Sequence, residues 1–219
     1  MKIVVLVIAS HDTVYDQFAT NWRSQDYPEN VKVYFLYCSE EQDSLIEVRG
    51  DCIYLKGREC VKPGLHHKTL SGMQYILSEP FDYLIRTNLT SFINFRKLNA
   101  FLEDKSVKNC MAGTRVCGGF LSGSGYVMTR DIVQDYLTWC DEECTTNPMV
   151  HFDDEFVGEY IKEKTITCHD LGMVTYTPDI GLAEAAEKLH VRFKSSADQR
   201  DRISDIEQHR GIIEIYNRA

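Results

Sequence analysis

Continuous apolar stretches alternate with amphipathic stretches along most of the chain. Residues 3–9 (IVVLVIA) are apolar without interruption and end at Ser10-His11-Asp12, which predicts a buried parallel strand. Further strands are predicted at residues 31–38, 51–55 and 81–87. Helical spacing of apolar residues predicts helices at residues 15–23, from Gly64 to before Pro80, at residues 98–102, and from Asp131 and Asp153. The glycines and serines of residues 120–129 (FLSGSGYVMT) are typical of a loop that enters a strand.

This order of elements predicts the fold class. Strands that alternate with helices, without a repeat, a low-complexity tract or a flexible linker, indicate a single α/β domain over residues 1–219. We expect a mostly parallel central sheet flanked by helices, as in Rossmann-like folds. Ligands of such sheets bind beyond the carboxyl ends of the strands. The candidate site is therefore near Ser10 and Asn88, although each could equally be a loop cap.

The composition is that of an ordinary globular protein and restricts its partners. Hydrophobic residues make up 43% of the chain and charged residues 26%. The 24 Lys and Arg residues face 33 Asp and Glu residues, for a net charge of -9. Nucleic acids and anionic membranes require clustered positive charge. We therefore expect no nucleic-acid partner, whereas a local basic pocket is compatible with this balance.

The eight cysteines do not indicate a secreted protein. The apolar run after Lys2 is too short for a signal-peptide core, and far shorter than the roughly 20 residues that span a membrane. We expect a cytoplasmic chain without a membrane span and with mostly reduced thiols. Cys140 and Cys144 lie four residues apart on a predicted helix and permit a zinc site, but no second Cys/His pair has zinc-finger spacing.

Two adjacent carboxylates begin one of the predicted helices. Asp153 and Asp154 occupy its first turn, and its buried face consists of residues 156, 157, 160 and 161. A carboxylate fixed in this way beside a pocket can act as a base. The alternative is that both aspartates only complement the helix dipole.

Several stretches, taken together, resemble the inverting β-1,3-glycosyltransferases of the galactosyltransferase and Fringe kind. The resemblance covers about residues 1–165. Lys68-Thr69-Leu70 resembles the family's Lys-Thr helix, and Arg86-Thr87 occupies a second Lys-Thr position, on the strand before the family's acidic triplet. Further matches are Phe92, Asn94 and Leu98, the strand and helix of SGSGYVMTRDIV (residues 122–133), and the helix start DDEFVGEYI (residues 153–161).

The resemblance implies a GT-A fold, a nucleotide-sugar donor such as a UDP-sugar, and an inverting displacement. It places the general base at Asp154, with Asp153 beside it. Donor-binding candidates are Ser10, Lys68, Arg86, Thr87, Asn88 and Thr90, and the acceptor or substrate loop is Gly123-Ser124-Gly125-Tyr126. The acceptor is expected to be a hydroxyl of a carbohydrate or glycoprotein. The expected lack of a membrane anchor would be unlike the Golgi members of the family and would suit a microbial or virus-encoded enzyme.

The sequence departs from the family at its metal site. Asn88-Leu89-Thr90 replaces the acidic triplet that ligates Mn²⁺ or Mg²⁺, and hard divalent cations favour several charged oxygens. Positive side chains can take over part of this task by neutralising the departing diphosphate. His190, Arg192 and Lys194 alternate along an extended run and so share one face. That face is either a donor-binding cationic face or a solvated edge strand.

Three functions therefore compete at this stage. One is an active transferase that depends weakly or not at all on a metal. Another is a catalytically silent module that binds a sugar nucleotide or a glycan with the same fold. An unrelated nucleotide-binding α/β protein is less compatible with the sequence, because no P-loop or glycine-rich dinucleotide turn follows the first strand.

Overall fold

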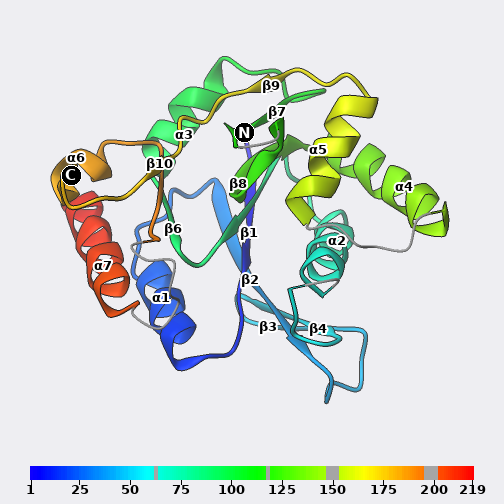
Figure 1. The fold of residues 1–219 in the computed structure, drawn as a ribbon, viewed down its shortest axis with the longest axis horizontal. Coiled ribbons are helices and arrows are strands. Elements are labelled where there is room, and N and C mark those ends of the chain that lie inside the picture. Colours follow the sequence, from blue (N-terminus) through cyan, green and yellow to red (C-terminus); the bar gives the residue numbers. More distant parts are fainter. Residues whose placement is uncertain (62–63, 117–118, 147–152, 195–201) are drawn as a thin grey trace.

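The structure, a computed structural model, describes residues 1–61, 64–116, 119–146, 153–194 and 202–219 (Figure 1). Its main sheet has eight strands in the order β3-β4-β2-β1-β5-β8-β7-β9, and a small sheet has the order β10-β11-β6. The strands are β1 (Ile3–Ile8), β2 (Val31–Ser39), β3 (Ile46–Arg49), β4 (Cys52–Lys56), β5 (Tyr83–Asn88), β6 (Ser91–Ile93), β7 (Met111–Arg115), β8 (Leu121–Thr129), β9 (Cys168–His169), β10 (Val174–Thr175) and β11 (His190–Arg192). The helices are α1 (Thr13–Arg23), α2 (Gly64–Ile76), α3 (Phe95–Glu103), α4 (Arg130–Thr146), α5 (Asp153–Glu163), α6 (Leu182–Ala186) and α7 (Ile203–Arg218).

The centre of the main sheet is parallel. Strands β4, β2, β1 and β5 lie side by side and run in the same direction. The uninterrupted apolar sequence of β1 follows from its central place, because both of its faces are covered. Val5 and Val7 belong to the core on one side of the sheet, and Val4 and Leu6 to the core on the other.

Helices cover both faces of this sheet (Figure 1). Helices α2, α4 and α5 contribute to one core, whereas α1, α3 and α7 contribute to the other. Two of the helices begin at side-chain caps: Asp12 Oδ1 accepts from the amide of Val14 at 2.8 Å, and Asn94 Oδ1 from the amide of Lys97 at 3.0 Å. The expected α/β architecture, with a mostly parallel central sheet flanked by helices, is confirmed.

The structure corrects the sequence analysis at three places. Residues 120–129 are not a loop entering a strand, because β8 begins at Leu121 and pairs antiparallel with β5 and β7. The elements that were not predicted are strands β3, β6, β7, β9 and β10 and helices α6 and α7. The run that contains His190 is not an edge strand, since β11 lies between β10 and β6.

The described cysteines form no disulfide with one another. Cys140, one half of the suggested zinc pair, is buried in the core, and the side chain of Cys144 lies outside what the structure describes, as does Cys117. Within the described ranges, no helix has the length and apolar character needed to cross a membrane.

Candidate functional site

A pocket of about 420 Å³ opens at the carboxyl ends of β1 and β5, and we call it the β1–β5 pocket. Its lining includes residues 8–10, residues 88–90, Tyr15 of α1, and the two cations Arg192 and Arg202. Since β1 and β5 are paired in register, Ile8 lies beside Asn88. Ser10 and Asn88, which the sequence analysis placed near each other, therefore line one pocket.

The small sheet brings Arg192 to this pocket. Strand β6 follows the turn at residues 88–90 directly, and β11 pairs with it so that Arg192 lies opposite Ser91. The amide of Phe193 donates to the carbonyl of Thr90 at 2.8 Å, which ties β11 to the turn. A cation about a hundred residues away in sequence is thereby held next to Asn88.

The two arginines are incompletely satisfied. Arg202 donates from Nη1 to the carbonyl of Phe193 at 3.0 Å and to Asp205 Oδ2 at 2.9 Å. The buried Nε atoms of Arg192 and Arg202 have no hydrogen-bond partner among the described residues. Burial and the charge of Arg202 lower the pKa of Arg192, while Asp154 opposes that shift. Two cations in the lining of one pocket are suited to an anion.

Polar side chains in and next to the turn at Asn88-Leu89-Thr90 form hydrogen bonds with one another. Asn88 Oδ1 accepts from the hydroxyls of Thr90 at 3.0 Å and Ser91 at 3.1 Å. The buried Leu89 offers only its carbonyl, which accepts from Trp22 Nε1 at 3.0 Å. The residues at the family's metal position therefore do not fit a divalent cation, because none is charged and the amide oxygen is already occupied.

Asp153 is buried below the surface of the site. Its carboxylate accepts from Arg86 Nη2 and, at 3.2 Å, from the hydroxyl of Thr69. The Arg86 and Asp153 side chains are only 2% and 3% exposed, and Arg86 also donates to the carbonyl of Gly123. Neither side chain therefore faces a ligand, which corrects the expectation of a catalytic Asp153 and a donor-binding Arg86. The two residues form the floor of the site.

Asp154 is half-buried and lies against β8. A Cβ atom added at Gly123 would be 3.0 Å from Asp154 Oδ2, so the missing side chain of Gly123 makes room for this carboxylate. Burial and then the Asp153 charge raise the pKa of Asp154, against the attraction of Arg86 and a backbone hydrogen bond from Gly123. Asn88 Nδ2 lies 3.5 Å from the carbonyl of the same glycine. Asp154 thus lies close to the pocket and carries a carboxylate of raised pKa.

The expected acceptor loop is a strand interior instead. Tyr126 is fully buried and its hydroxyl has no described partner, so it cannot face a sugar. The carbonyl of Ser124 accepts from the hydroxyl of Thr87 at 2.6 Å, which makes Thr87 a structural link between β5 and β8. A Cβ atom added at Gly125 would be 2.6 Å from His190 Cε1, so Gly125 makes room for that ring.

The expected cationic face of three residues reduces to Arg192. Burial, followed by the charge of Arg192, lowers the pKa of His190 to about 4, so this ring is uncharged at neutral pH. Lys194 is exposed and lies outside the described lining of the pocket. Arg202, which does line it, was missed, because it lies among acidic residues at the start of a helix that showed no clear signal.

The buried side chain of Lys68 contacts the end of β1. Its Nζ donates to the carbonyl of Ala9 at 2.6 Å and to Glu59 Oε2 at 2.7 Å, and its side chain is 1% exposed. Glu59 itself lines the β1–β5 pocket. Lys68 therefore offsets the charge of Glu59 and holds the end of β1, rather than facing the pocket as a donor-binding residue.

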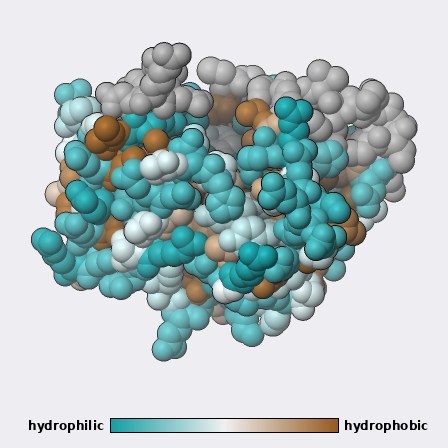
Figure 2. Space-filling model, turned by 90° about the horizontal axis from the view of Figure 1, so that it is seen from below, coloured by the Kyte–Doolittle hydropathy of each residue, from teal (hydrophilic) through white to brown (hydrophobic). Residues whose placement is uncertain are grey.

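The face seen from below the view of Figure 1 is mainly hydrophilic, and its hydrophobic residues form small separate groups (Figure 2). Across the described residues, no cluster of three or more His, Cys, Asp or Glu side chains could hold a metal ion. The described site offers two guanidinium groups, an amide, hydroxyls, the Glu59 carboxylate that Lys68 offsets, and the nearby Asp154 carboxylate of raised pKa.

No protein-family model matches the sequence, and no curated protein is significantly similar to it. Solved structures match the fold. The apo form of the glycosyltransferase GlyE of Streptococcus pneumoniae TIGR4 has a TM-score of 0.56 at 14% identity, over 100% of this chain and 63% of the GlyE chain. A second GlyE structure has a TM-score of 0.55 at the same identity and coverage.

A third similar structure is a glycosyltransferase involved in the glycosylation of the major capsid of PBCV-1. It has a TM-score of 0.55 at 10% identity, over 95% of this chain and 98% of that one. This chain spans 63% of the length of GlyE but nearly the whole of the PBCV-1 protein. The fold is therefore one that glycosyltransferases adopt.

Proposed function

We propose that this protein is a glycosyltransferase of the GT-A type that transfers a sugar from a nucleotide-sugar donor, such as a UDP-sugar, to a hydroxyl acceptor. Residues 1–219 would form one transferase domain. The observation that carries the proposal is the pair of cations, Arg192 and Arg202, in the lining of a pocket at the carboxyl ends of β1 and β5. Similar folds in known glycosyltransferases support it.

The arginines hold the diphosphate of the donor. Their planar donors suit phosphate oxygens, and the two positive charges neutralise the charge that develops on the leaving group. Ser10, Asn88 and Thr90 border the same space and hydrogen-bond the ribose or a phosphate. Because residues 88–90 do not fit a divalent cation, this binding depends weakly or not at all on Mn²⁺ or Mg²⁺.

Asp154 is the general base. It removes the proton of the acceptor hydroxyl as that oxygen attacks the anomeric carbon, while the bond from that carbon to the diphosphate breaks and the configuration inverts. The raised pKa of Asp154 makes it a stronger base than an ordinary aspartate. The acceptor is a carbohydrate or a glycoprotein, consistent with the neighbour that is involved in glycosylating the PBCV-1 capsid.

The lack of charge in the turn at residues 88–90 also favours a second function. A module that binds a sugar nucleotide without turnover would also lack charged residues at positions 88–90, and would keep the arginines. The fold similarity is the same for both functions. Turnover of the donor distinguishes them.

The test is a thermal-shift series with UDP, UDP-glucose, UDP-galactose and UDP-N-acetylglucosamine in EDTA, followed by release of UDP from each sugar nucleotide. A ligand that binds only the folded state raises its melting temperature. We expect UDP and at least one UDP-sugar to stabilise the protein in EDTA and that donor to be turned over. Stabilisation without turnover, even with added carbohydrate acceptors, would favour the silent module. No stabilisation by any of them, with or without Mn²⁺, would refute both.

A further inference from the structure

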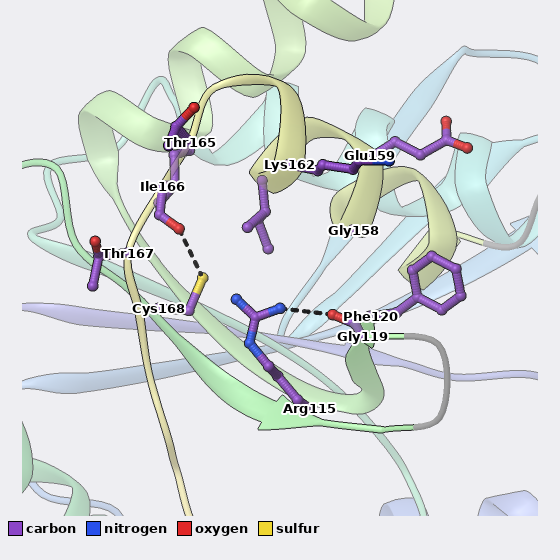
Figure 3. A pocket seen from close by; sticks show the side chains of 11 residues that line it. Arg115, Gly119, Phe120, Gly158, Glu159, Lys162, Thr165, Ile166, Thr167 and Cys168 are labelled. Carbon is purple, nitrogen blue, oxygen red and sulfur yellow. Dashed lines mark hydrogen bonds between the residues drawn. The ribbon is translucent and has the colours of Figure 1, made fainter.

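A second and larger pocket, of about 840 Å³, lies beside α5 (Figure 3), and we call it the α5 pocket. It is lined by Arg115 at the end of β7, Phe120 before β8, one side of α5, and residues 165–168. Strand β7 is antiparallel to β8, which is antiparallel to β5, so Arg115 lies at the same edge of the sheet as Asn88. The α5 pocket reaches this edge at Arg115 and Phe120, and it extends along α5 to Cys168, which pairs with Met111 at the start of β7.

Asp154 lines neither pocket, but it is linked to the lining of each through one glycine. Gly158, in the lining of the α5 pocket, is one helical turn beyond Asp154 on the same side of α5. On the other side, Asp154 contacts Gly123, whose carbonyl lies 3.5 Å from Asn88 Nδ2 in the lining of the β1–β5 pocket. The end of the α5 pocket at Arg115 and Phe120 is therefore the end nearest this carboxylate.

Arg115 supplies a positively charged group to the α5 pocket. In Figure 3 its guanidinium extends into the cavity, whereas the carboxylate of Glu159 points away from it. The guanidinium donates from Nη1 to the carbonyl of Gly119 at 2.7 Å and forms no ion pair with a described carboxylate. Lys162 at the rim also lacks a described ion pair, and the hydroxyl-bearing Thr165 and Thr167 complete the polar lining.

The rest of the lining is partly apolar. Phe120 lies against α5, where a Cβ atom added at Gly158 would be 2.3 Å from Phe120 Cδ1. The absence of a side chain at Gly158 thus lets the ring pack there, and Ile161 and Ile166 extend the apolar part. A pocket with an aromatic ring, hydroxyls and an open guanidinium matches a sugar, whose ring has apolar faces, when that sugar carries a negative charge.

We propose that the α5 pocket is the acceptor site, and that it selects a sugar bearing an anionic group, a phosphate or a carboxylate, through Arg115. This inference rests on the proposed function, since it assigns the second substrate of the same reaction. Phe120 supports the sugar ring, and Arg115 binds the anionic group. The hydroxyl to be glycosylated then faces Asp154.

The test measures the affinity of the full chain for glucose 6-phosphate, glucuronate and methyl glucoside by calorimetry, with inorganic phosphate as a further probe. We expect one of the two anionic sugars to bind more tightly than methyl glucoside and than inorganic phosphate. Arg115→Met should weaken that binding by about tenfold or more, the usual contribution of a charge-assisted hydrogen bond. Arg49→Met is the matched control, because Arg49 is an exposed arginine on β3, away from this pocket. Saturating UDP should leave the affinity unchanged.

Several outcomes would overturn the inference. They are equal affinity in Arg115→Met, equal affinity for methyl glucoside or for inorganic phosphate, the absence of binding by both anionic sugars, and competition with UDP. The proposed function is judged separately by UDP binding to the native protein and to Arg115→Met, which should be the same. If the native protein does not bind UDP, the proposed donor site is refuted. If it binds UDP but neither anionic sugar, only the acceptor site is refuted.

Discussion

Two arginine–aspartate neighbourhoods lie at the same edge of the sheet and differ in how far their charges are satisfied. In the floor, Arg86 and Asp153 pair directly, and both side chains are almost fully buried. Beside the pocket, Arg192 and Asp154 form no ion pair, although the charge of Asp154 raises the pKa of Arg192 against the effect of burial. Adjacent residues of one helix, Asp153 and Asp154, therefore belong to different environments.

The difference indicates which charged residues hold the site in place and which are available to bind a ligand. A buried ion pair gives little net stability over an apolar pair, but removing one partner is costly. The floor can thus hold Gly123, and through it Asp154, in a fixed position. Charges that remain partly unsatisfied beside the pocket are the ones available to a ligand.

The largest expected effect is on stability, from Asp153→Asn. The change leaves the Arg86 charge buried without its partner, so we expect the free energy of unfolding to fall by about 3–5 kcal/mol. Urea denaturation of the variant and the native protein measures this. Glu159→Gln, an exposed carboxylate on the same helix, is the control and should change stability little. A loss below about 1 kcal/mol for Asp153→Asn, within the range of an average substitution, would contradict the separate roles of the two aspartates.

The next effect is on turnover, from Asp154→Asn. Removing a positioned base should lower donor turnover by about 10²-fold or more. Stability should be kept or increased, because the raised pKa means that the folded state disfavours the charged carboxylate. The same urea series and a UDP-release assay measure both quantities. Normal turnover in this variant would remove Asp154 from the mechanism.

The same variant has a consequence for pH dependence. Asp154 must be unprotonated to act, so the native rate should fall as pH decreases through its pKa, at a higher pH than the usual aspartate value of about 3.9. The residual activity of Asp154→Asn should lack this acidic limb. An unchanged pH profile would mean that another group controls it.

The smallest of the three effects is on donor affinity, from Arg192→Met. A charge-assisted hydrogen bond contributes roughly 1.5–3 kcal/mol, so UDP binding in EDTA should weaken on the order of 10- to 100-fold. Added salt should weaken native binding as well, because Arg192 is only partly buried. Lys194→Met, two residues away and exposed, is the control and should bind normally. Equal losses of UDP affinity in both variants would mean that Lys194 belongs to the donor-binding cationic face as well. Strict dependence of binding on Mn²⁺ would indicate that acidic metal ligands come from elsewhere in the chain.

Local patterns were sufficient for the framework of the protein. The apolar run of β1 and the spacing of α2 predict a covered strand and an amphipathic helix, because burial on two faces or on one face leaves a different periodicity. The same patterns placed Ser10 and Asn88 together, since carboxyl ends of parallel strands meet at one edge. The glycines of β8 were misread because they resemble turn residues, although two of them make room for Asp154 and His190.

By itself, then, the sequence determined the α/β framework, the edge at which the pocket lies, and Asp154 as a candidate base. The tertiary structure decided which charges are available there. It buried Asp153 against Arg86, 67 positions apart in the chain, left His190 uncharged, and brought Arg192 and Arg202 to the pocket. The reason is that the state of a charged side chain depends on burial and on partners distant in sequence, and neither leaves a periodic signal in the local pattern of residues.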